Sequence, residues 1–132
     1  MKERKKKLVV LIRSCETALS RLRKSLAQRR NEFTRDSAIK RFEFSFELFW
    51  KCLQAFCAYQ GIECNSPRES IQQAFRLKVL SQDRTYLEML EDRNLSSHSY
   101  NEDVAKEIFS RLKRYADAIE TVLKSIKKGL EK

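Results

Sequence analysis

The sequence of 132 residues contains only two glycines and one proline. Sandwiches and barrels of β-strands need turn residues roughly every eight to twelve positions, because each short strand ends in a turn. A chain this poor in glycine and proline does not fit those folds. We predict an all-α protein, an up-and-down bundle of about four to five helices. The length is typical of one domain, so we expect residues 1–132 to form a single domain.

The chain also lacks a long apolar run. A basic start, residues 1–7, is followed by five apolar residues, 8–12, and then by Arg13. This run is shorter than the apolar core of a signal peptide, roughly 7–15 residues, and far shorter than a membrane span of about 20. We expect residues 1–7 to be a basic N-terminal tail, and the protein to be soluble and cytoplasmic, with no membrane partner.

The cysteines show neither a C-x-x-C pair nor the spacing of a zinc site. They are Cys15, Cys52, Cys57 and Cys64. Cys15 and Cys52 fall within apolar helical stripes, where cysteine behaves as a small hydrophobic residue. The sequence therefore predicts reduced thiols, no metal site and no cofactor.

Basic residues are in excess, with 28 lysines and arginines against 18 acidic residues and a net charge of +10. Such a balance favours polyanionic partners, nucleic acid first and an acidic protein second. Part of the charge only solvates helix surfaces, as with Glu47 and Lys51, which have the favourable i,i+4 spacing. Charge alone does not distinguish among these partners.

Apolar residues recur with helical spacing through most of the chain. The expected helices cover residues 5–28, 35–60, 67–77, 82–94 and 102–128. Thr34, Ser66 and Asn101 are the expected N-caps, and Gly61 is placed to end the second helix. The run Ser66-Pro67-Arg68-Glu69 supplies a cap, a first-turn proline and a capping-box glutamate.

The second predicted helix carries a wide apolar surface. One stripe consists of Ile39, Phe42, Phe46, Phe49, Leu53 and Phe56, and its neighbour of Phe44, Leu48, Cys52, Ala55 and Tyr59. At about 100° per residue the two stripes join into an arc wider than half of the helix circumference. A helix of this kind contacts several neighbours. We therefore expect it to be the central helix of the bundle, with Phe42 and its neighbours in the core.

Residues 92–100 read Asp-Arg-Asn-Leu-Ser-Ser-His-Ser-Tyr and include the only histidine of the chain. The guanidinium of Arg93 can bind a phosphate through two parallel N–H groups. His98 is the one side chain whose unperturbed pKa lies near neutrality, and Tyr100 offers a hydroxyl. This combination indicates chemistry on a phosphodiester or a nucleotide.

Each residue of this cluster also has a plain structural explanation. Arg93 at a helix end can satisfy the last carbonyls and the helix dipole. His98 can be a surface residue, and Tyr100 a half-buried anchor before the Asn101 cap. Asp92 is not expected to pair with Arg93, because adjacent side chains diverge on a helix.

The spacing of Arg93, His98 and Tyr100 resembles the signature of the HEPN superfamily. More specifically, it resembles the HepT-like proteins, also called nucleotidyltransferase substrate-binding proteins. The segments that add to the resemblance are residues 41–51, 66–69 and 89–94. The similarity covers most of the chain, about residues 14–122.

The resemblance implies a helical bundle that pairs into a homodimer. Active members of the family are metal-independent ribonucleases and act as toxins in toxin–antitoxin pairs. Their antitoxin is a small nucleotidyltransferase that attaches AMP to the tyrosine of the motif. By position, Arg93 and His98 take the ribonuclease roles and Tyr100 is the AMP acceptor. The implied partners are RNA, a cognate nucleotidyltransferase and a second copy of the chain.

Three further residues are candidates for a supporting role. Asn94 lies beside Arg93 in the sequence, and Glu43 and Glu47 lie one turn apart on the second predicted helix. The two glutamates either orient Arg93 or His98 or form a solvated stripe, and the stripe is the simpler interpretation.

RNA cleavage without metal needs a base for the 2′-hydroxyl, an acid for the leaving oxygen and a cation for the phosphorane. Arg93 fits the cation role and His98 either proton-transfer role, but one chain has only one histidine. A two-fold dimer with a shared cleft would supply two of each. Our first hypothesis is a HepT-like ribonuclease toxin. The alternatives are a non-enzymatic substrate-binding subunit of a two-component nucleotidyltransferase, and a helical adaptor that uses its basic surface.

Overall fold

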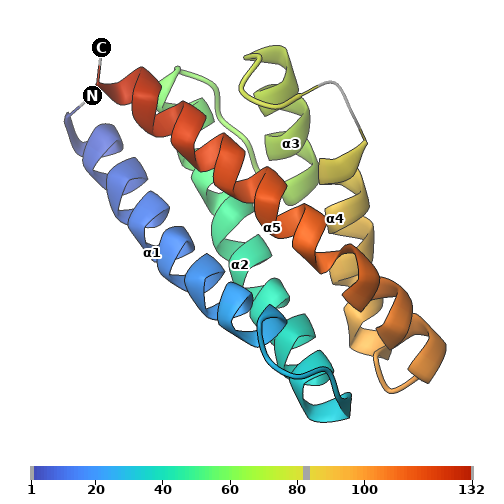
Figure 1. The fold of residues 1–132 in the computed structure, drawn as a ribbon. Helices are drawn as coiled ribbons and strands as arrows, with labels where there is room; N and C mark the ends of the chain where they lie inside the picture. The colour runs from blue at the N-terminus through green and yellow to red at the C-terminus, as the bar shows by residue number, and fades with distance from the viewer. Residues whose placement is uncertain (1, 82–83, 132) are drawn as a thin grey trace.

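The computed structural model describes residues 2–81 and 84–131. In this part of the chain it contains five α-helices, one short 3-10 helix (η1) and no strand (Figure 1). In chain order they are α1 (Lys2–Leu26), α2 (Glu32–Tyr59), α3 (Pro67–Arg76), α4 (Thr85–Leu95), η1 (Ser96–His98) and α5 (Glu102–Leu130). The predicted all-α class is confirmed.

The three long helices form the body of the bundle. Figure 1 shows α1, α2 and α5 running side by side, with the shorter α3 and α4 packed along one side. α2 is the central helix, as predicted, because it packs against α1, α3, α4 and α5. Phe42, Phe46 and Phe49 are fully buried, and the ring of Phe42 stacks on that of Tyr115 with 5.4 Å between centroids. These aromatic side chains join α2 to α5.

The apolar arc of α2 is not wholly covered. Phe44 is 56% exposed, and Leu48, one turn further along, is only partly buried. The neighbouring helices close over the Phe42 stripe but leave part of the second stripe open. A wide apolar arc thus gives α2 both a core face and an exposed apolar strip.

α1 begins earlier than predicted. It starts at Lys2, so residues 2–7 form its first turns and are not a separate tail. Arg4 Nη1 donates a hydrogen bond of 2.7 Å to the carbonyl of Ala58 near the end of α2. Lys5 Nζ lies 3.5 Å from the carbonyl of Leu130 at the end of α5. The helix continues through the basic run because the run contains no helix breaker and its side chains reach the ends of two neighbouring helices.

The start of α2 also differs from the prediction. Asn31, not Thr34, is the N-cap, and its side chain accepts hydrogen bonds from the backbone N–H groups of Phe33 and Thr34. The Thr34 hydroxyl in turn accepts from the Asn31 N–H, which makes Thr34 the third residue of a capping box. Both residue types can cap a helix, and this reciprocal pair places the boundary one turn earlier.

The remaining helix ends follow the prediction more closely. Ser66 and Asn101 are the N-caps of α3 and α5. Gly61, in the left-handed region with φ of 86°, lies just beyond the end of α2. Glu69 departs from the predicted capping box, because its carboxylate accepts from the N–H of Asn65 at 3.3 Å. The first predicted residues of the fourth helix, 82 and 83, lie outside the described residues, and α4 begins at Thr85.

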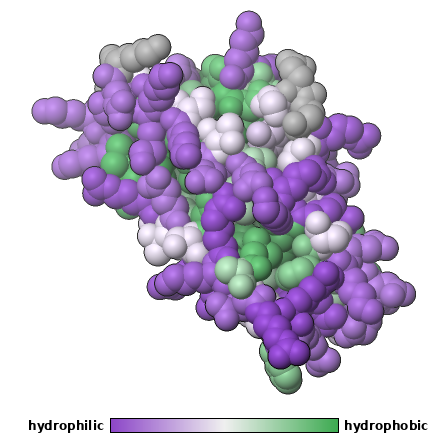
Figure 2. Space-filling view, viewed as in Figure 1, coloured by the Kyte–Doolittle hydropathy of each residue, from purple (hydrophilic) through white to green (hydrophobic). Residues whose placement is uncertain are grey.

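Hydrophilic side chains cover most of the face seen in Figure 2, and apolar ones show between them and at the lower end. None of the helices within residues 2–81 and 84–131 combines the length and apolarity needed to span a bilayer.

Candidate functional site

The predicted cluster lies at the junction of α4 and α5. α4 ends at Leu95 and η1 follows it directly. Asn101 then caps α5, its side-chain oxygen accepting hydrogen bonds from two backbone N–H groups of the first turn. Arg93 therefore projects from the last turn of α4, whereas His98 and Tyr100 lie on the connection to α5.

A carboxylate of the central helix holds the guanidinium of Arg93. Arg93 Nη2 donates a hydrogen bond of 2.9 Å to Glu47 Oε2, and Lys51 Nζ lies 3.6 Å from the other Glu47 oxygen. The side chains of Arg93 and Glu47 are 35% and 37% exposed. An ion pair this exposed contributes about 0–1 kcal/mol, so its main effect is on the direction of the guanidinium. Asn94 Oδ1 is only a long contact of Arg93 Nη1, at 3.5 Å.

Glu43, one turn before Glu47, contacts the same junction through a different residue. The Ser96 hydroxyl lies 3.0 Å from Glu43 Oε2 and 2.7 Å from the Arg93 carbonyl, with geometry for a hydrogen bond to each. Ser96 is buried, and Glu43 also lies 3.9 Å from Lys40. Both predicted supporting glutamates thus lie against the junction of α4 and α5 that carries Arg93, which we call the Arg93 junction. Neither glutamate contacts His98 by a hydrogen bond within the described chain.

His98 and Tyr100 form a pair of their own. His98 Nδ1 and the Tyr100 hydroxyl are 3.1 Å apart, and the two rings meet edge to face at 72°. Which of the two atoms donates depends on the tautomer of the imidazole. Tyr100 is 82% exposed, so it is not the half-buried anchor that the structural alternative required. No hydrogen bond or ion pair in the described residues joins Arg93 to His98.

Asp92, next to Arg93 in the chain, is buried and bound to α5. Arg111 donates two hydrogen bonds to its carboxylate, of 2.7 and 2.9 Å, and the Tyr115 hydroxyl donates a third. The hydrogen bond to Asp92 raises the pKa of Arg111. Burial, reinforced by that carboxylate, raises the pKa of Tyr115 well above its ordinary value. The last turn of α4 is therefore fixed to α5 through Asp92 and to α2 through Ser96, with Arg93 between them.

The start of α5 is tied to α2 by another ion pair. The two terminal nitrogens of Arg35 donate to the two carboxylate oxygens of Glu102 at 2.9 and 3.0 Å. This hydrogen bonding lowers the pKa of Glu102 below its ordinary value and raises that of Arg35. Glu102 follows Tyr100 by two residues, so the pair holds the backbone just beyond the exposed tyrosine.

Several side chains that build this junction were not predicted from the sequence. They are Asp92, Ser96, Arg111 and Tyr115. The sequence could have indicated the role of Ser96, because it follows Arg93 by three residues, a spacing at which a hydroxyl can donate a hydrogen bond to a helical carbonyl. Asp92 and Arg111 are 19 residues apart on two helices, so no local pattern pairs them.

The described residues contain no group of histidine, cysteine, aspartate and glutamate side chains that could hold a metal ion. The cysteines are free and buried. Burial raises the pKa of the Cys57 thiol to about 12, which leaves it protonated and unreactive at neutral pH.

Comparison with known proteins agrees with this architecture. A crystal structure of a protein from Thermus thermophilus is 41% identical in sequence and superposes with a TM-score of 0.79. The match covers 83% of this chain and 95% of that one. A comparison with curated proteins finds no match. A sequence model described as nucleotidyltransferase substrate binding protein like matches residues 11–128. Since that match spans nearly the whole bundle, the chain belongs to the nucleotidyltransferase substrate binding protein like family.

Proposed function

We propose that this protein is the substrate-binding subunit of a two-component nucleotidyltransferase. In this role it has no catalytic activity of its own and presents a substrate to a separate nucleotidyltransferase. The observation that carries the proposal is the partly exposed Arg93 guanidinium, which Glu47 orients through one N–H and which forms no other ion pair among the described residues. Such a group recognises a phosphate by charge and by parallel N–H donors, and needs no proton transfer to do so.

The inventory of titratable groups also favours binding over catalysis by a single chain. Metal-free cleavage of RNA requires both a general base and a general acid. His98 is the only histidine, and its Nδ1 already faces the Tyr100 hydroxyl. Neither of the carboxylates that reach the junction from α2 contacts His98 by a hydrogen bond within the described part of the chain. Within the described residues of one protomer, His98 therefore has neither a second imidazole nor a hydrogen-bonded carboxylate beside it.

A second candidate function is a metal-independent ribonuclease toxin of the HepT-like type. The exposed Tyr100 hydroxyl, 3.1 Å from His98 Nδ1, favours it. In a homodimer with a shared cleft, two copies of Arg93 and His98 would supply a cation, an acid and a base for RNA cleavage. A cognate nucleotidyltransferase would control this activity by modifying Tyr100.

That modification is chemically straightforward at Tyr100. The hydroxyl oxygen attacks the α-phosphate of ATP, an O–P bond to AMP forms, and pyrophosphate leaves. The phenolic proton goes to a base, for which His98 Nδ1 is already within hydrogen-bond distance. The added phosphate would place negative charge and bulk beside the Arg93 junction and repel RNA.

One experiment separates the two functions. Purified protein is incubated with RNA in excess chelator, wild type beside His98→Ala, and each is tested for a complex with the nucleotidyltransferase. The binding-subunit proposal expects intact RNA in both samples and complex formation by both proteins. RNA cleavage by the wild type that His98→Ala abolishes would overturn it in favour of the ribonuclease. Absence of any complex would also contradict the proposal.

A further inference from the structure

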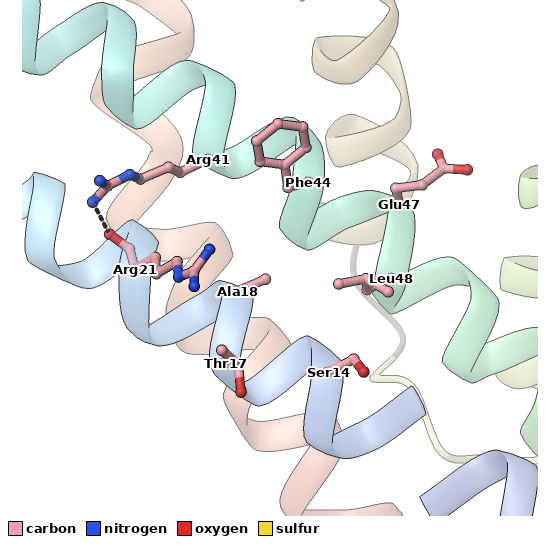
Figure 3. Close-up of a pocket in the computed structure, with 8 residues that line it drawn as sticks. All are labelled: Ser14, Thr17, Ala18, Arg21, Arg41, Phe44, Glu47 and Leu48. Carbon is pink, nitrogen blue, oxygen red and sulfur yellow. Dashed lines mark hydrogen bonds between the residues drawn. The ribbon is translucent and has the colours of Figure 1, made fainter. Parts of the chain in front are cut away.

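A groove between α1 and α2 lies beside the Arg93 junction and shares Glu47 with it. Its volume is about 460 Å³, within the range of roughly 300–1,000 Å³ that is typical of small-molecule sites. It is lined by Ser14, Thr17, Ala18 and Arg21 of α1 and by Arg41, Phe44, Glu47 and Leu48 of α2. Figure 3 shows these side chains along the two neighbouring helices.

Two arginines stand at one end of the groove. Arg41 Nη1 donates a hydrogen bond of 2.8 Å to the main-chain carbonyl of Arg21, which brings the two residues together (Figure 3). Neither guanidinium forms an ion pair with a carboxylate among the described residues. Their positive charges are therefore available to an anion, and phosphate is one of the anions that the planar guanidinium binds through parallel N–H groups.

The only carboxylate among the described residues that line this groove does not cancel that charge. Glu47 is already bound by Arg93 at 2.9 Å and lies 3.6 Å from Lys51. Lys40, which lies above the ring of Phe44 at 5.6 Å from its centroid, is 3.9 Å from the Glu43 carboxylate, so it does not add to this charge. The end of the groove around Arg21 and Arg41 is therefore positive.

The middle of the groove is apolar. Phe44, which is 56% exposed, lines the groove there together with Ala18 and Leu48. An exposed aromatic ring beside these arginines matches a ligand that combines a flat ring with an anionic group. Aromatic side chains that stack bases and cations that bind the attached phosphate are the common elements of nucleotide recognition.

We infer that the groove between α1 and α2 binds a nucleotide, with the base against Phe44 and the phosphate between Arg21 and Arg41. The inference rests on the proposed function, since it names the substrate class of the binding subunit. Because Glu47 lines the groove and also holds Arg93, a nucleotide bound here lies next to the junction that a partner enzyme would reach.

Calorimetric titration of the purified protein with AMP, adenosine and ribose 5-phosphate tests the assignment. AMP should bind more tightly than either fragment, because only AMP carries both the base and the phosphate. Phe44→Ala should weaken AMP binding about tenfold through the loss of base stacking. Arg21→Gln and Arg41→Gln should each weaken AMP binding to a similar degree while leaving adenosine binding unchanged.

Matched controls are available on the same two helices. Phe33→Ala removes an 81% exposed phenylalanine of α2, and Arg13→Gln an exposed arginine of α1, both outside the groove. AMP binding by these variants should equal that of the wild type. Circular dichroism establishes that each variant is folded. Phe44→Leu keeps an apolar side chain but removes the aromatic ring, so it provides a second test of stacking.

A nucleotide can reach the groove free or as part of RNA, so a short single-stranded oligoadenylate is titrated beside AMP. Tighter binding of the oligoadenylate that depends on Phe44 identifies RNA as the source, and equal or weaker binding identifies the free nucleotide. AMP affinity unchanged in Phe44→Ala would overturn the inference. An absence of AMP binding would also overturn it. Light scattering in which Phe44→Ala turns a wild-type dimer into a monomer would then identify the face as an interface between copies.

The same variants separate this inference from the proposed function. Loss of AMP binding in Phe44→Ala with an intact nucleotidyltransferase complex supports both. If AMP binds through Phe44 and Arg41 but no complex forms, the groove assignment stands and the proposed function fails. If the complex forms and AMP does not bind, the proposed function stands and the groove assignment fails.

Discussion

Arg93 of α4 and Glu47 of α2 form an ion pair of 2.9 Å although 46 residues separate them in the chain. The pair connects the predicted polar cluster to the central helix. It also lies at the boundary between the α4–α5 junction and the α1–α2 groove, because Glu47 belongs to both. The two surfaces that we assign to ligand binding therefore meet at a single carboxylate.

The ion pairs of Asp92 and Glu47 should contribute very differently to stability. Asp92→Ala leaves Arg111 without its buried partner and should lower the free energy of unfolding by about 3 kcal/mol. Glu47→Ala removes a partly exposed pair and should lower it by about 1 kcal/mol or less. Urea unfolding of both variants measures the difference. Equal losses would show that the buried pair of Asp92 is no more stabilising than the exposed one.

The two apolar stripes of α2 should also differ in how much they contribute to the free energy of unfolding. Phe46 is fully buried and Phe44 is exposed, so Phe46→Ala should cost about 3–5 kcal/mol and Phe44→Ala less than about 1 kcal/mol. Thermal or urea unfolding of the two variants is the test. A large loss in Phe44→Ala would mean that the groove face is covered in solution.

Acid should destabilise the protein partly through Glu102. Hydrogen bonds from Arg35 lower the pKa of Glu102 below its ordinary value of 4.5. The folded state then binds fewer protons than the unfolded state. The stabilisation is present above that ordinary value and is lost as the pH falls through the lowered pKa.

Glu102→Gln should therefore lose less stability than the wild type on going from about pH 6 to about pH 3. Urea unfolding at the two pH values gives the comparison. Glu63→Gln, which removes an exposed carboxylate outside this pair, is the control and should follow the wild type. Identical pH dependence in Glu102→Gln and the wild type would contradict the expectation.

Tyr100→Phe should leave stability unchanged, because the side chain is 82% exposed. If the second candidate function holds, the same change should abolish transfer of label from ATP labelled at the α-phosphate by the cognate nucleotidyltransferase. Mass spectrometry of the intact protein measures the transfer. Tyr59→Phe, which changes a partly buried tyrosine of α2, is a control, and this variant should accept the label like the wild type. Label retained in Tyr100→Phe would place the acceptor elsewhere.

Local features of the fold were predictable. The helices and the caps Ser66 and Asn101 follow from apolar spacing and from side chains that act within one turn. The errors were local too, since Asn31 competed with Thr34 for the cap of α2. The central position of α2 was also predictable, because only a helix with many neighbours can cover so wide an apolar arc.

The sequence by itself determined an all-helical bundle, the order of its elements and the junction at which Arg93, His98 and Tyr100 lie. Only the tertiary structure decided that Glu47 faces Arg93, that Asp92 is buried against Arg111, and that Phe44 is left in an open groove. The reason is geometric. A helical pattern specifies which residues share a face, but the rotation of one helix against another depends on how all the buried side chains pack together.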